Sequence, residues 1–542
     1  MKLPRRTRFV RRRMHGLPAP KFDVGYEPGV RIPMPDGVEL SADHYFPDPA
    51  RSRAFPTLLV RSPYGRGLPW AALYGLIFAE QGFQVLLQSS RGTGGSQGIV
   101  QPWRDDGPDG LATVAWLRGQ PWFDGRLGLL GPSAMAYSAW AVAADPPPEV
   151  KAMVVHVPLH SPHEFFYRGG AFALEDALIA STAFATRHLG PRKFLSAALR
   201  LARGMKRIVR AQEPVQEFAR VMGRHVQVLE TAAAHPDPSD GIWQGTNLLA
   251  AADGFTVPTL VVSGWSDVAL DQALRQYSRL PAGSRSLLIG PWTHTSALQQ
   301  DAGRVFGETV AWLQGRLGDS TPPKGRVQIS VGPENAWREL PGWPPAALPV
   351  AWYTDEHGTL RDGAPDSAAP VGSLHYDPDD PTPSVGGAGL GRSAGVRDNG
   401  TLERRPDVLV FSSAALTETV EVIGTVAADL TVRVSGIADA SEGEADSDRD
   451  TTKIFVRLCD VDDRGHSYNV CDGIAKIPAT ALIGAGQEVR VTVAMSATAH
   501  RFRPGHRIRV QISAGAHPRF AAGRHAHSIE IQAGSAVVLP VV

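Results

Sequence analysis

The stretch Leu129–Tyr137, which reads Leu-Leu-Gly-Pro-Ser-Ala-Met-Ala-Tyr, decides the fold of this 542-residue chain. Apolar residues before its serine predict a buried strand, and the alanine-rich run Ala134–Ala144 predicts a helix after it. A strand that turns this sharply into a helix needs small neighbours, and the turn lifts the serine hydroxyl above the sheet. The stretch therefore predicts a nucleophile elbow at Ser133, with Ala136 in the place of the usual second glycine. A serine that only caps the helix is the alternative.

The elbow lies within a series of alternating strands and helices, which predicts a parallel sheet covered on both faces. After an antiparallel hairpin over residues 30–46, strands are expected at Phe55–Val60, Phe83–Leu87, Leu127–Leu130, Ala152–Val157, Pro258–Val262 and Ser286–Ile289. Helices are expected at Trp70–Gln81, Asp109–Arg118, Ala134–Ala144, Val268–Leu280 and Ala302–Leu317. The glycine-rich loop Arg91–Gly98 lacks the spacing of phosphate-binding motifs, so a tight structural loop is expected there.

Two further regions have a different character. Helical periodicity without strand alternation predicts a cap of helices at Phe172–Leu189, Lys193–Ala211 and Val215–Ala234. Beyond the proline-rich linker 319–325, an all-β sandwich or jelly roll is predicted from short alternating strands at Val327–Val331, Ala351–Thr354, Val408–Ser412, Val420–Ile423, Leu430–Val434, Lys453–Cys459, Glu488–Ala494 and Arg507–Ile512. The predicted organisation is a basic tail (1–24), an α/β domain (25–159 and 250–318), a helical cap (160–249) and a β domain (326–542).

Composition excludes several classes of protein. The formal net charge of +1 creates no overall field that would attract nucleic acid. No run of about 18 apolar residues occurs, so no membrane-spanning helix is expected. The N-terminal arginines are followed by Met14–Pro18 rather than by the apolar segment of a signal peptide. A soluble cytoplasmic protein with a solvated basic leader is expected, and a homodimer is left open.

The chain offers little for metals or disulfides. Its two cysteines, Cys459 and Cys471, match no disulfide framework and no zinc site, so free thiols are expected. Asp460–Gly465 resembles the start of a calcium loop, but Arg464 and Cys471 stand where ligands are needed, which favours a hairpin turn. The acidic run Glu442–Asp450 is expected to be a solvated loop. No metal or cofactor is expected.

Two residues downstream of the elbow complete a catalytic pattern. In α/β-hydrolases the serine, acid and histidine follow one another in that order, each after a strand. Asp267 follows the strand Pro258–Val262, and His294 follows the strand Ser286–Ile289. A hydroxyl is a weak nucleophile until an imidazole takes its proton, and a carboxylate orients that imidazole. The order and context predict a triad with Ser133.

Two histidines and two hydrogen-bond donors are further candidates for the active site. His156 and His160 also follow a strand but precede the acid, so they are expected at the base of the cap or in the pocket. An oxyanion hole needs two donors, of which the first is the N–H of Ala134. In the loop Arg61–Gly65 the proline has no N–H, so the phenolic hydroxyl of Tyr64 is the expected second donor. A tyrosine that only packs is the alternative.

At this point the sequence resembles the CocE/NonD family, the cocaine esterase-like and X-Pro dipeptidyl-peptidase-like serine hydrolases. The motifs occur in family order: R-S-P-Y-G, R-G-T-G-G-S-Q-G, G-P-S-A-M-A, G-W-S-D and G-P-W-T-H. They continue through V-G-P-E-N-A-W-R-E-L-P-G-W-P-P, Y-D-P-D-D-P-T-P-S-V-G-G, R-P-D-V-L-V-F and G-H-R-I-R-V-Q-I. The resemblance spans residues 25–535 and implies an α/β-hydrolase domain, a helical cap and a C-terminal jelly roll. It implies these roles: nucleophile Ser133, acid Asp267, base His294, oxyanion donor Tyr64.

The resemblance also implies an activity, which is acyl-enzyme hydrolysis of a small-molecule ester or amide without metal. Carboxylesterases, dipeptidyl peptidases acting after proline, and acylases all remain open. A dipeptidyl peptidase needs an anion for the substrate's amino group, which Glu164, Glu175 or Asp176 in the cap could supply, unless they are surface charges. A binding protein that uses the jelly roll beside a vestigial hydrolase site is the alternative from another class.

This sequence departs from the family pattern beside the nucleophile. Ala134 stands where the family usually has tyrosine, so its N–H is kept while a wall of the pocket is lost. Ser90 stands where an aspartate is common. Neither change removes a catalytic group. Because of the first change, however, the family resemblance does not determine which substrate this protein takes.

Overall fold

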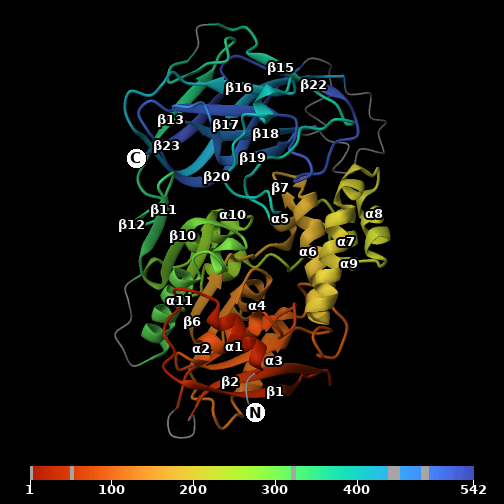
Figure 1. The fold of residues 1–542 in the computed structure, drawn as a ribbon, viewed down its shortest axis with the longest axis vertical. Helices are drawn as coiled ribbons and strands as arrows, with labels where there is room; N and C mark the ends of the chain where they lie inside the picture. Colours follow the sequence, from red (N-terminus) through yellow and green to blue (C-terminus); the bar gives the residue numbers. More distant parts are fainter. Residues whose placement is uncertain (1–3, 49–53, 319–324, 365–366, 437–451, 478–486) are drawn as a thin grey trace.

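The structure is a computed structural model, and it describes residues 4–48, 54–318, 325–364, 367–436, 452–477 and 487–542. Figure 1 shows a sheet with its helices at one end, a β domain at the other, and a group of helices to the side of both. The expected loop at 442–450 and most of the expected linker lie outside the described residues. The fold is thus an α/β-hydrolase domain joined to an antiparallel β domain, as the sequence predicted.

The central sheet has ten strands in the order β1-β2-β4-β3-β5-β6-β9-β10-β11-β12. Its strands are β1 (Asp23–Pro33), β2 (Glu39–Asp48), β3 (Thr57–Ser62), β4 (Gln84–Ser89), β5 (Leu127–Pro132), β6 (Val150–His156), β9 (Thr259–Ser266), β10 (Arg285–Thr293), β11 (Val327–Val331) and β12 (Ala336–Leu340). From β4 to β11 neighbouring strands run parallel, whereas β1, β2 and β12 pair antiparallel. Loops that follow the parallel strands therefore meet at one edge of the sheet, where a site can form.

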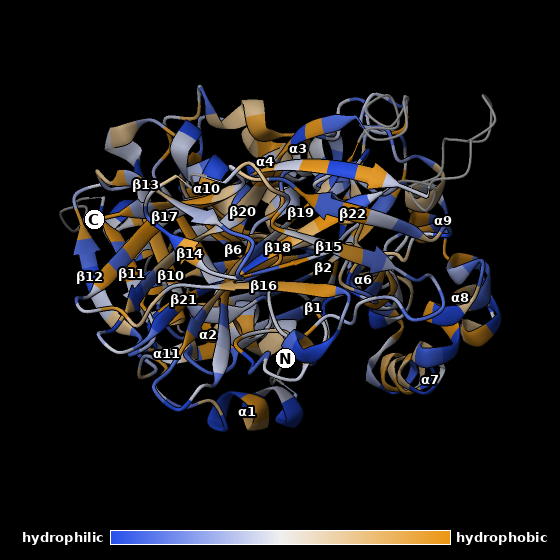
Figure 2. Cartoon of the chain, turned by 90° about the horizontal axis from the view of Figure 1, so that it is seen from above, coloured by the Kyte–Doolittle hydropathy of each residue, from blue (hydrophilic) through white to orange (hydrophobic). Residues whose placement is uncertain are grey.

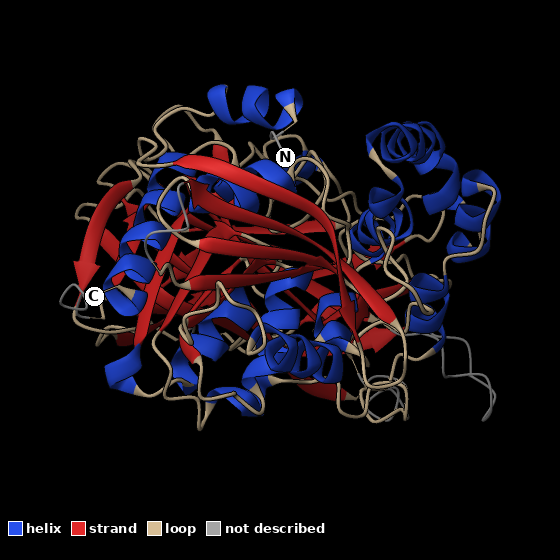
Figure 3. Cartoon of the chain, turned by 90° about the horizontal axis from the view of Figure 1, so that it is seen from below, coloured by secondary structure: helices blue, strands red, loops and turns tan. Residues whose placement is uncertain are grey.

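Helices cover both faces of this sheet, as the continuous apolar strands require (Figure 3). On β5, Leu129 belongs to one buried cluster and Leu130 to the other, because successive side chains point to opposite faces. One face packs against α3 (Asp106–Leu117), α4 (Ala134–Ala143) and α10 (Leu270–Arg279). The other packs against a π-helical turn (Ala71–Leu76), α2 (Ile77–Ala79) and α11 (Ala302–Leu317).

The N-terminal segment differs from the predicted solvated tail of residues 1–24. Arg5–Arg12 forms helix α1, which packs against the π-helical turn, and β1 already begins at Asp23. The guanidinium of Arg11 donates a 2.7 Å hydrogen bond to Glu80, and both side chains are largely buried. A charge count along the sequence cannot reveal this ion pair, because its two residues lie 69 positions apart.

The predicted cap is helical, with five α-helices where three were expected. It contains α5 (Pro162–Phe166), a short hairpin (Tyr167–Arg168 and Ala171–Phe172), α6 (Leu174–Thr186), α7 (Pro191–Arg210), α8 (Pro214–Met222) and α9 (Gln227–Ala234). The run expected as one helix over 215–234 is divided at Gly223, which takes a left-handed conformation with φ 68°. Glycine adopts this conformation without a Cβ penalty, so it ends α8. Figure 2 shows α7 and α8 at the periphery, away from the central strands.

The C-terminal domain is built from two antiparallel sheets that enclose one apolar core. The larger sheet contains β13 (Leu348–Thr354), β14 (Leu360–Arg361), β15 (Gly372–Tyr376), β17 (Val420–Ser435), β20 (Glu488–Phe502), β22 (His527–Ile531) and β23 (Ala536–Val541). The smaller contains β16 (Val408–Ser412), β18 (Lys453–Val461), β19 (Ser467–Lys476) and β21 (Arg507–Ser513). The two strands expected at 420–423 and 430–434 are one long strand, β17, whose register shifts between Thr425 and Ala427.

The predicted start of the β domain at residue 326 is displaced. Strands β11 and β12 follow that residue, yet they extend the hydrolase sheet, since Leu287–Ile289 of β10 pairs with Val327–Ile329. A boundary beyond Leu340 therefore describes the structure better. Ile423 and Ala497 of the β domain belong to the same buried cluster as the hydrolase core, so the two domains share apolar packing.

A chain that ends after Leu317 is expected to aggregate or to lose activity. It would leave β10 as an open edge and expose the apolar residues that β11 covers. Size-exclusion chromatography and ester hydrolysis test this. A second chain that ends after Leu340 keeps the complete sheet and shows whether the β domain itself is needed. A monomeric, fully active chain ending at Leu317 would contradict the prediction.

Candidate active site

Ser133 lies at the turn between β5 and α4, in the strained geometry of an elbow. Its φ is 55° and its ψ is −122°, a conformation that non-glycine residues rarely adopt. The turn is crowded, because a Cβ on Gly131 would lie 2.7 Å from the Cβ of Met135 and 2.8 Å from its carbonyl carbon. The amide of Ser133 donates a hydrogen bond to the carbonyl of His156 on the neighbouring strand. Such strain persists only where surrounding structure enforces it, and it is typical of functional sites.

The structure brings His294 and Asp267 to this serine. Nε2 of His294 lies 2.9 Å from Oγ of Ser133, and Nδ1 lies 2.7 Å from Oδ1 of Asp267. The acid is 1% exposed, and its oxygens accept hydrogen bonds from the hydroxyl of Ser263 (2.6 Å) and the amide of Ala269 (2.9 Å). With both oxygens occupied the carboxylate cannot rotate, so it orients the imidazole toward the serine.

Tyr64 also lies beside the side chain of Ser133. Its ring stacks on Trp70 at 5.7 Å and meets Phe184 of the cap at 5.2 Å, which places the hydroxyl firmly. Burial raises the pKa of this hydroxyl to about 12, while the charge of Arg187 and a hydrogen bond with the Ser133 side chain oppose the rise. The hydroxyl therefore stays protonated at neutral pH and can donate a hydrogen bond. Ala134 is the first residue of α4, so its N–H has no acceptor within that helix and stays the other predicted donor.

The two rival histidines are structural. His156 is fully buried and bonds the hydroxyls of Tyr74 and Thr309, each at 2.8 Å. His160 is also fully buried and takes a hydrogen bond of 3.1 Å from the side chain of Gln276. Burial lowers the pKa of each to about 3, so both are neutral. Neither imidazole is hydrogen-bonded to Ser133, although the backbone carbonyl of His156 accepts the amide of that residue.

The three acids of the cap are engaged elsewhere. Glu164 pairs with Arg275, and Asp176 pairs with Arg168 and accepts a hydrogen bond from the amide of Leu390. Glu175 packs against the β-domain loop near Gly391, and burial raises its pKa. None of the three lines the cavity beside the nucleophile.

That cavity has a volume of about 420 Å³ and is the main concavity next to the elbow in the part of the chain that the structure describes. Ala134 and Ser138 of α4 line one side, and Trp103, Phe184 and Val226 give it apolar surface. Its size is within the range of small-molecule sites. Because residue 134 carries only a methyl group, the space next to the nucleophile stays open.

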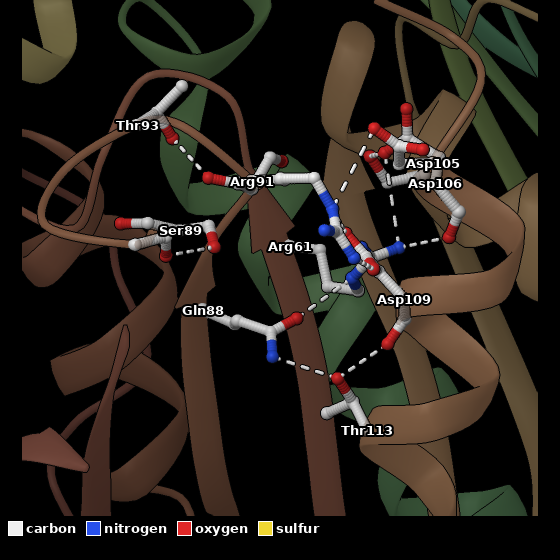
Figure 4. A network of polar contacts seen from close by, with 12 residues as sticks. Arg61, Gln88, Ser89, Arg91, Thr93, Asp105, Asp106, Asp109 and Thr113 are labelled. Carbon is white, nitrogen blue, oxygen red and sulfur yellow. Dashed lines mark hydrogen bonds and ion pairs between the residues drawn. The ribbon is translucent and has the colours of Figure 1, made fainter. Parts of the chain in front are cut away.

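The far end of the cavity holds an acidic network that sequence reasoning missed (Figure 4). Asp105 is the residue before α3, and Asp106 and Asp109 lie in its first turn. Arg91 pairs with Asp109 at 2.6 Å, and Arg61 is buried beside all of them. The sequence signal was three acids at the start of a predicted helix. Such acids are common there without any functional role, because they stabilise the helix dipole.

The candidate calcium loop and the two cysteines have structural roles. Asp460–Gly465 contains the end of β18 and the turn that leads to β19. In that turn Asp462 accepts hydrogen bonds from the amides of Arg464 and His466, so the preference for a hairpin over a calcium loop is confirmed. Cys459 and Cys471 are free and buried, as expected. Within the described ranges, no group of three or more histidine, cysteine, aspartate or glutamate residues is arranged to hold a metal ion. No described helix is long and apolar enough to cross a membrane.

Comparison with known proteins agrees with this geometry. Residues 36–296 match the X-Pro dipeptidyl-peptidase (S15 family) model, and residues 319–537 match the model of its C-terminal non-catalytic domain. Fold and site together define a serine hydrolase. Cocaine esterase from Rhodococcus sp. (strain MB1 Bresler) is 30% identical over 552 residues, which cover 91% of each chain. The chain belongs to the CocE/NonD family of these hydrolases, as its motifs implied.

Solved structures share the whole fold. An aminopeptidase from the marine sediment archaeon Thaumarchaeota archaeon superposes with a TM-score of 0.79 at 19% identity, covering 100% of this chain and 98% of that one. An α-amino acid ester hydrolase gives a TM-score of 0.78 at 20% identity, covering 98% and 99%. A CocE/NonD family hydrolase from Staphylococcus aureus gives 0.68 at 15% identity, covering 95% and 94%. At these identities the likeness concerns the fold alone.

Proposed function

We propose that this serine hydrolase is a carboxylesterase that forms its acyl-enzyme on Ser133. The observation that carries the proposal is the continuous contact from Oγ of Ser133 through His294 to the buried carboxylate of Asp267, at 2.9 Å and 2.7 Å. His294 takes the serine proton as Oγ attacks the ester carbonyl, and then gives that proton to the leaving alcohol. Water attacks the acyl-enzyme in the same way and releases the acid. Asp267 keeps Nδ1 protonated and stabilises the imidazolium.

The negative charge that develops on the carbonyl oxygen is held by the N–H of Ala134 and the hydroxyl of Tyr64. Both donors are fixed before the substrate arrives, one by α4 and the other by its stacked ring. Preorganised donors stabilise the tetrahedral intermediate without a reorganisation cost.

Two observations favour an ester over an X-Pro dipeptide. The relative at 30% identity is a cocaine esterase. In addition, Glu164 and Asp176 of the cap are neutralised by arginines, so they do not offer a free anion for a peptide's amino group.

The neighbouring thiols Cys459 and Cys471 remain unpaired, which suits the reducing cytoplasm as the place of action. The homodimer stays a prediction, to be tested by the particle mass in solution.

The proposal is tested by labelling the protein with a fluorophosphonate and by assaying aryl esters beside proline-containing dipeptide amides and thioesters. We expect one labelled serine, Ser133, and faster turnover of the esters. A protein that hydrolyses only the dipeptide amides would replace the esterase by a dipeptidyl peptidase. An unlabelled, inactive protein would favour the binding-protein alternative.

Replacing Tyr64 with phenylalanine is expected to lower kcat by about 10²–10³-fold, because one oxyanion donor is lost while the ring and its stacking stay. KM should change far less, since this hydrogen bond is strongest with the charged intermediate. Steady-state kinetics on an activated aryl ester measure both constants, and thermal melting verifies the fold. A folded variant whose kcat stays within about threefold of wild type would mean that another group fills the hole.

A further inference from the structure

We propose that the cavity beside Ser133 is a specificity pocket for a substrate arm that ends in a protonated amine, with the carboxylate of Asp106 as its partner. The proposal deepens the esterase function and rests on it. It concerns the arm of the substrate that does not react.

The cavity reaches from Ala134, the residue that follows the nucleophile, to Asp106 along one face of α4. Ala134 and Ser138 both line it, and residues four apart on a helix lie one above the other. Ser138 donates a 2.5 Å hydrogen bond to Oδ1 of Asp106. The carboxylate therefore lies about one helical turn, roughly 5–6 Å, beyond the residue that follows the nucleophile. A group held at Asp106 would belong to the same molecule as an ester held at Ser133.

The absence of a large side chain at position 134 makes this path available. Ala134 is 2% exposed, and its methyl group forms part of the cavity wall. Trp103 and Phe184 contribute aromatic surface, with ring centroids 5.5 Å apart and nearly perpendicular planes. The walls between ester and carboxylate are therefore apolar, so the arm that crosses them is a hydrocarbon chain or ring.

The charge at the far end is negative in excess. Arg61 and Arg91 oppose Asp105, Asp106 and Asp109 there, while the third arginine of the cavity lining, Arg224, is exposed to solvent. Arg91 is occupied by Asp109 at 2.6 Å and by Asp36 outside the cavity, also at 2.6 Å. Arg61 uses its donors on the carbonyl of Asp106 and the side chain of Gln88, and it stays 3.9 Å from the carboxylate of Asp106.

Asp106 is consequently the carboxylate with unused capacity. None of the described residues donates a hydrogen bond to its Oδ2, and burial raises the pKa of this group, as expected for a carboxylate short of partners. Oδ2 of Asp105 and Oγ of Ser90 also lie in the cavity wall, buried and without a hydrogen bond. Figure 4 shows Asp105 and Asp106 side by side, with the side chains of Arg61 and Arg91 next to them.

An ammonium group satisfies this set best. It has three donors and no acceptor. The wall offers Oδ2 of Asp105 and Oγ of Ser90, which are buried without a hydrogen bond, and Oδ2 of Asp106, to which no described residue donates. A hydroxyl would bring one donor and leave the excess negative charge uncompensated. An anion would be repelled by the three carboxylates. Arg224 and His225 also line the cavity but are exposed to solvent, and Arg224 donates a hydrogen bond to the carbonyl of Ala185.

The test compares two rigid esters of equal size. One is 4-nitrophenyl trans-4-(aminomethyl)cyclohexanecarboxylate, and the other is its neutral trans-4-ethyl analogue; a second pair carries the same arms on the alcohol of an acetate. In wild type, kcat/KM for the amine is expected to exceed that for the neutral ester by about 10–100-fold in one pair, as for a hydrogen-bonded charge pair. In Asp106→Asn, which keeps the acceptor for Ser138, that ratio should fall to about one.

A matched control is Asp36→Asn, which removes a carboxylate from the same arginine network but does not line the cavity. This variant should keep the wild-type ratio. Ala134→Tyr should lower kcat/KM for both cyclohexane esters relative to 4-nitrophenyl acetate, because the ring would block the path.

The outcomes separate the two proposals. A wild type that hydrolyses the neutral esters but shows a ratio near one in both pairs would overturn the amine pocket and leave the esterase intact. A preference that survives in Asp106→Asn would also overturn it. A wild type that hydrolyses none of the esters would overturn the esterase itself. If Asp106→Asn does not fold, the wild-type ratio alone decides.

Discussion

Replacing Ser133 with alanine is expected to lower kcat for ester hydrolysis by about 10⁶-fold, the loss seen when a serine nucleophile is removed. The hydroxyl is the only atom lost, and His294 then has no proton to take. The residual rate would come from the oxyanion donors and from binding, which still accelerate attack by water about 10³–10⁴-fold. Fluorophosphonate labelling should disappear together with turnover.

The fold should survive this change. The strained φ of 55° at position 133 is imposed by the turn and not by the hydroxyl, so alanine experiences the same strain as serine. Thermal melting should shift by little. Ser263→Ala is a matched control, because it removes another hydroxyl of the site that touches only the acid. A Ser133→Ala protein with more than about 1% of wild-type turnover would place the nucleophile elsewhere.

Replacing Asp267 with alanine is expected to lower kcat by about 10⁴-fold. The change removes the acceptor of the His294 Nδ1 proton and leaves the amide of Ala269 without its partner. The imidazole then loses both its orientation and the charge that stabilises its protonated form. Steady-state kinetics at saturating ester measure the loss, with KM expected to stay within a few fold.

Asp267→Asn separates orientation from charge. The amide oxygen of asparagine can keep the bonds to His294 and Ala269, while its NH₂ can donate to the hydroxyl of Ser263. Only the charge is lost, so kcat should fall less than in the alanine variant. Equal losses in both would mean that charge alone matters. Turnover near wild type in both would exclude Asp267 from the mechanism.

Local patterns predicted most of the hydrolase domain. Helix α11 was expected at Ala302–Leu317 and is observed there, because its apolar period is strong and a proline-rich segment follows it. Strands β11 and β16 were also expected with their observed bounds. Small strands such as β14, with two residues, carry too little pattern to be recognised.

Other features depended on partners that are distant in the chain. The long strand β17 was expected as two strands, since Gly424 and the register shift near Thr425 look like a turn in the sequence. It continues because β20, β22 and β23 all pair with it. Similarly, the arginines of α1 predicted a solvated tail, whereas in the structure Arg11 pairs with Glu80.

The sequence by itself determined the class of the protein and the identity of the residues proposed for catalysis. Ser133, Asp267 and His294 each follow a strand in the required order, and parallel strands bring the loops after them to one edge. The tertiary structure alone decided what surrounds them. Asp106 reaches the cavity because α3 packs against α4, and two acids of the cap, Glu164 and Asp176, are neutralised by arginines. Packing and charge pairing join residues far apart in the chain, so periodicity and motifs cannot predict them.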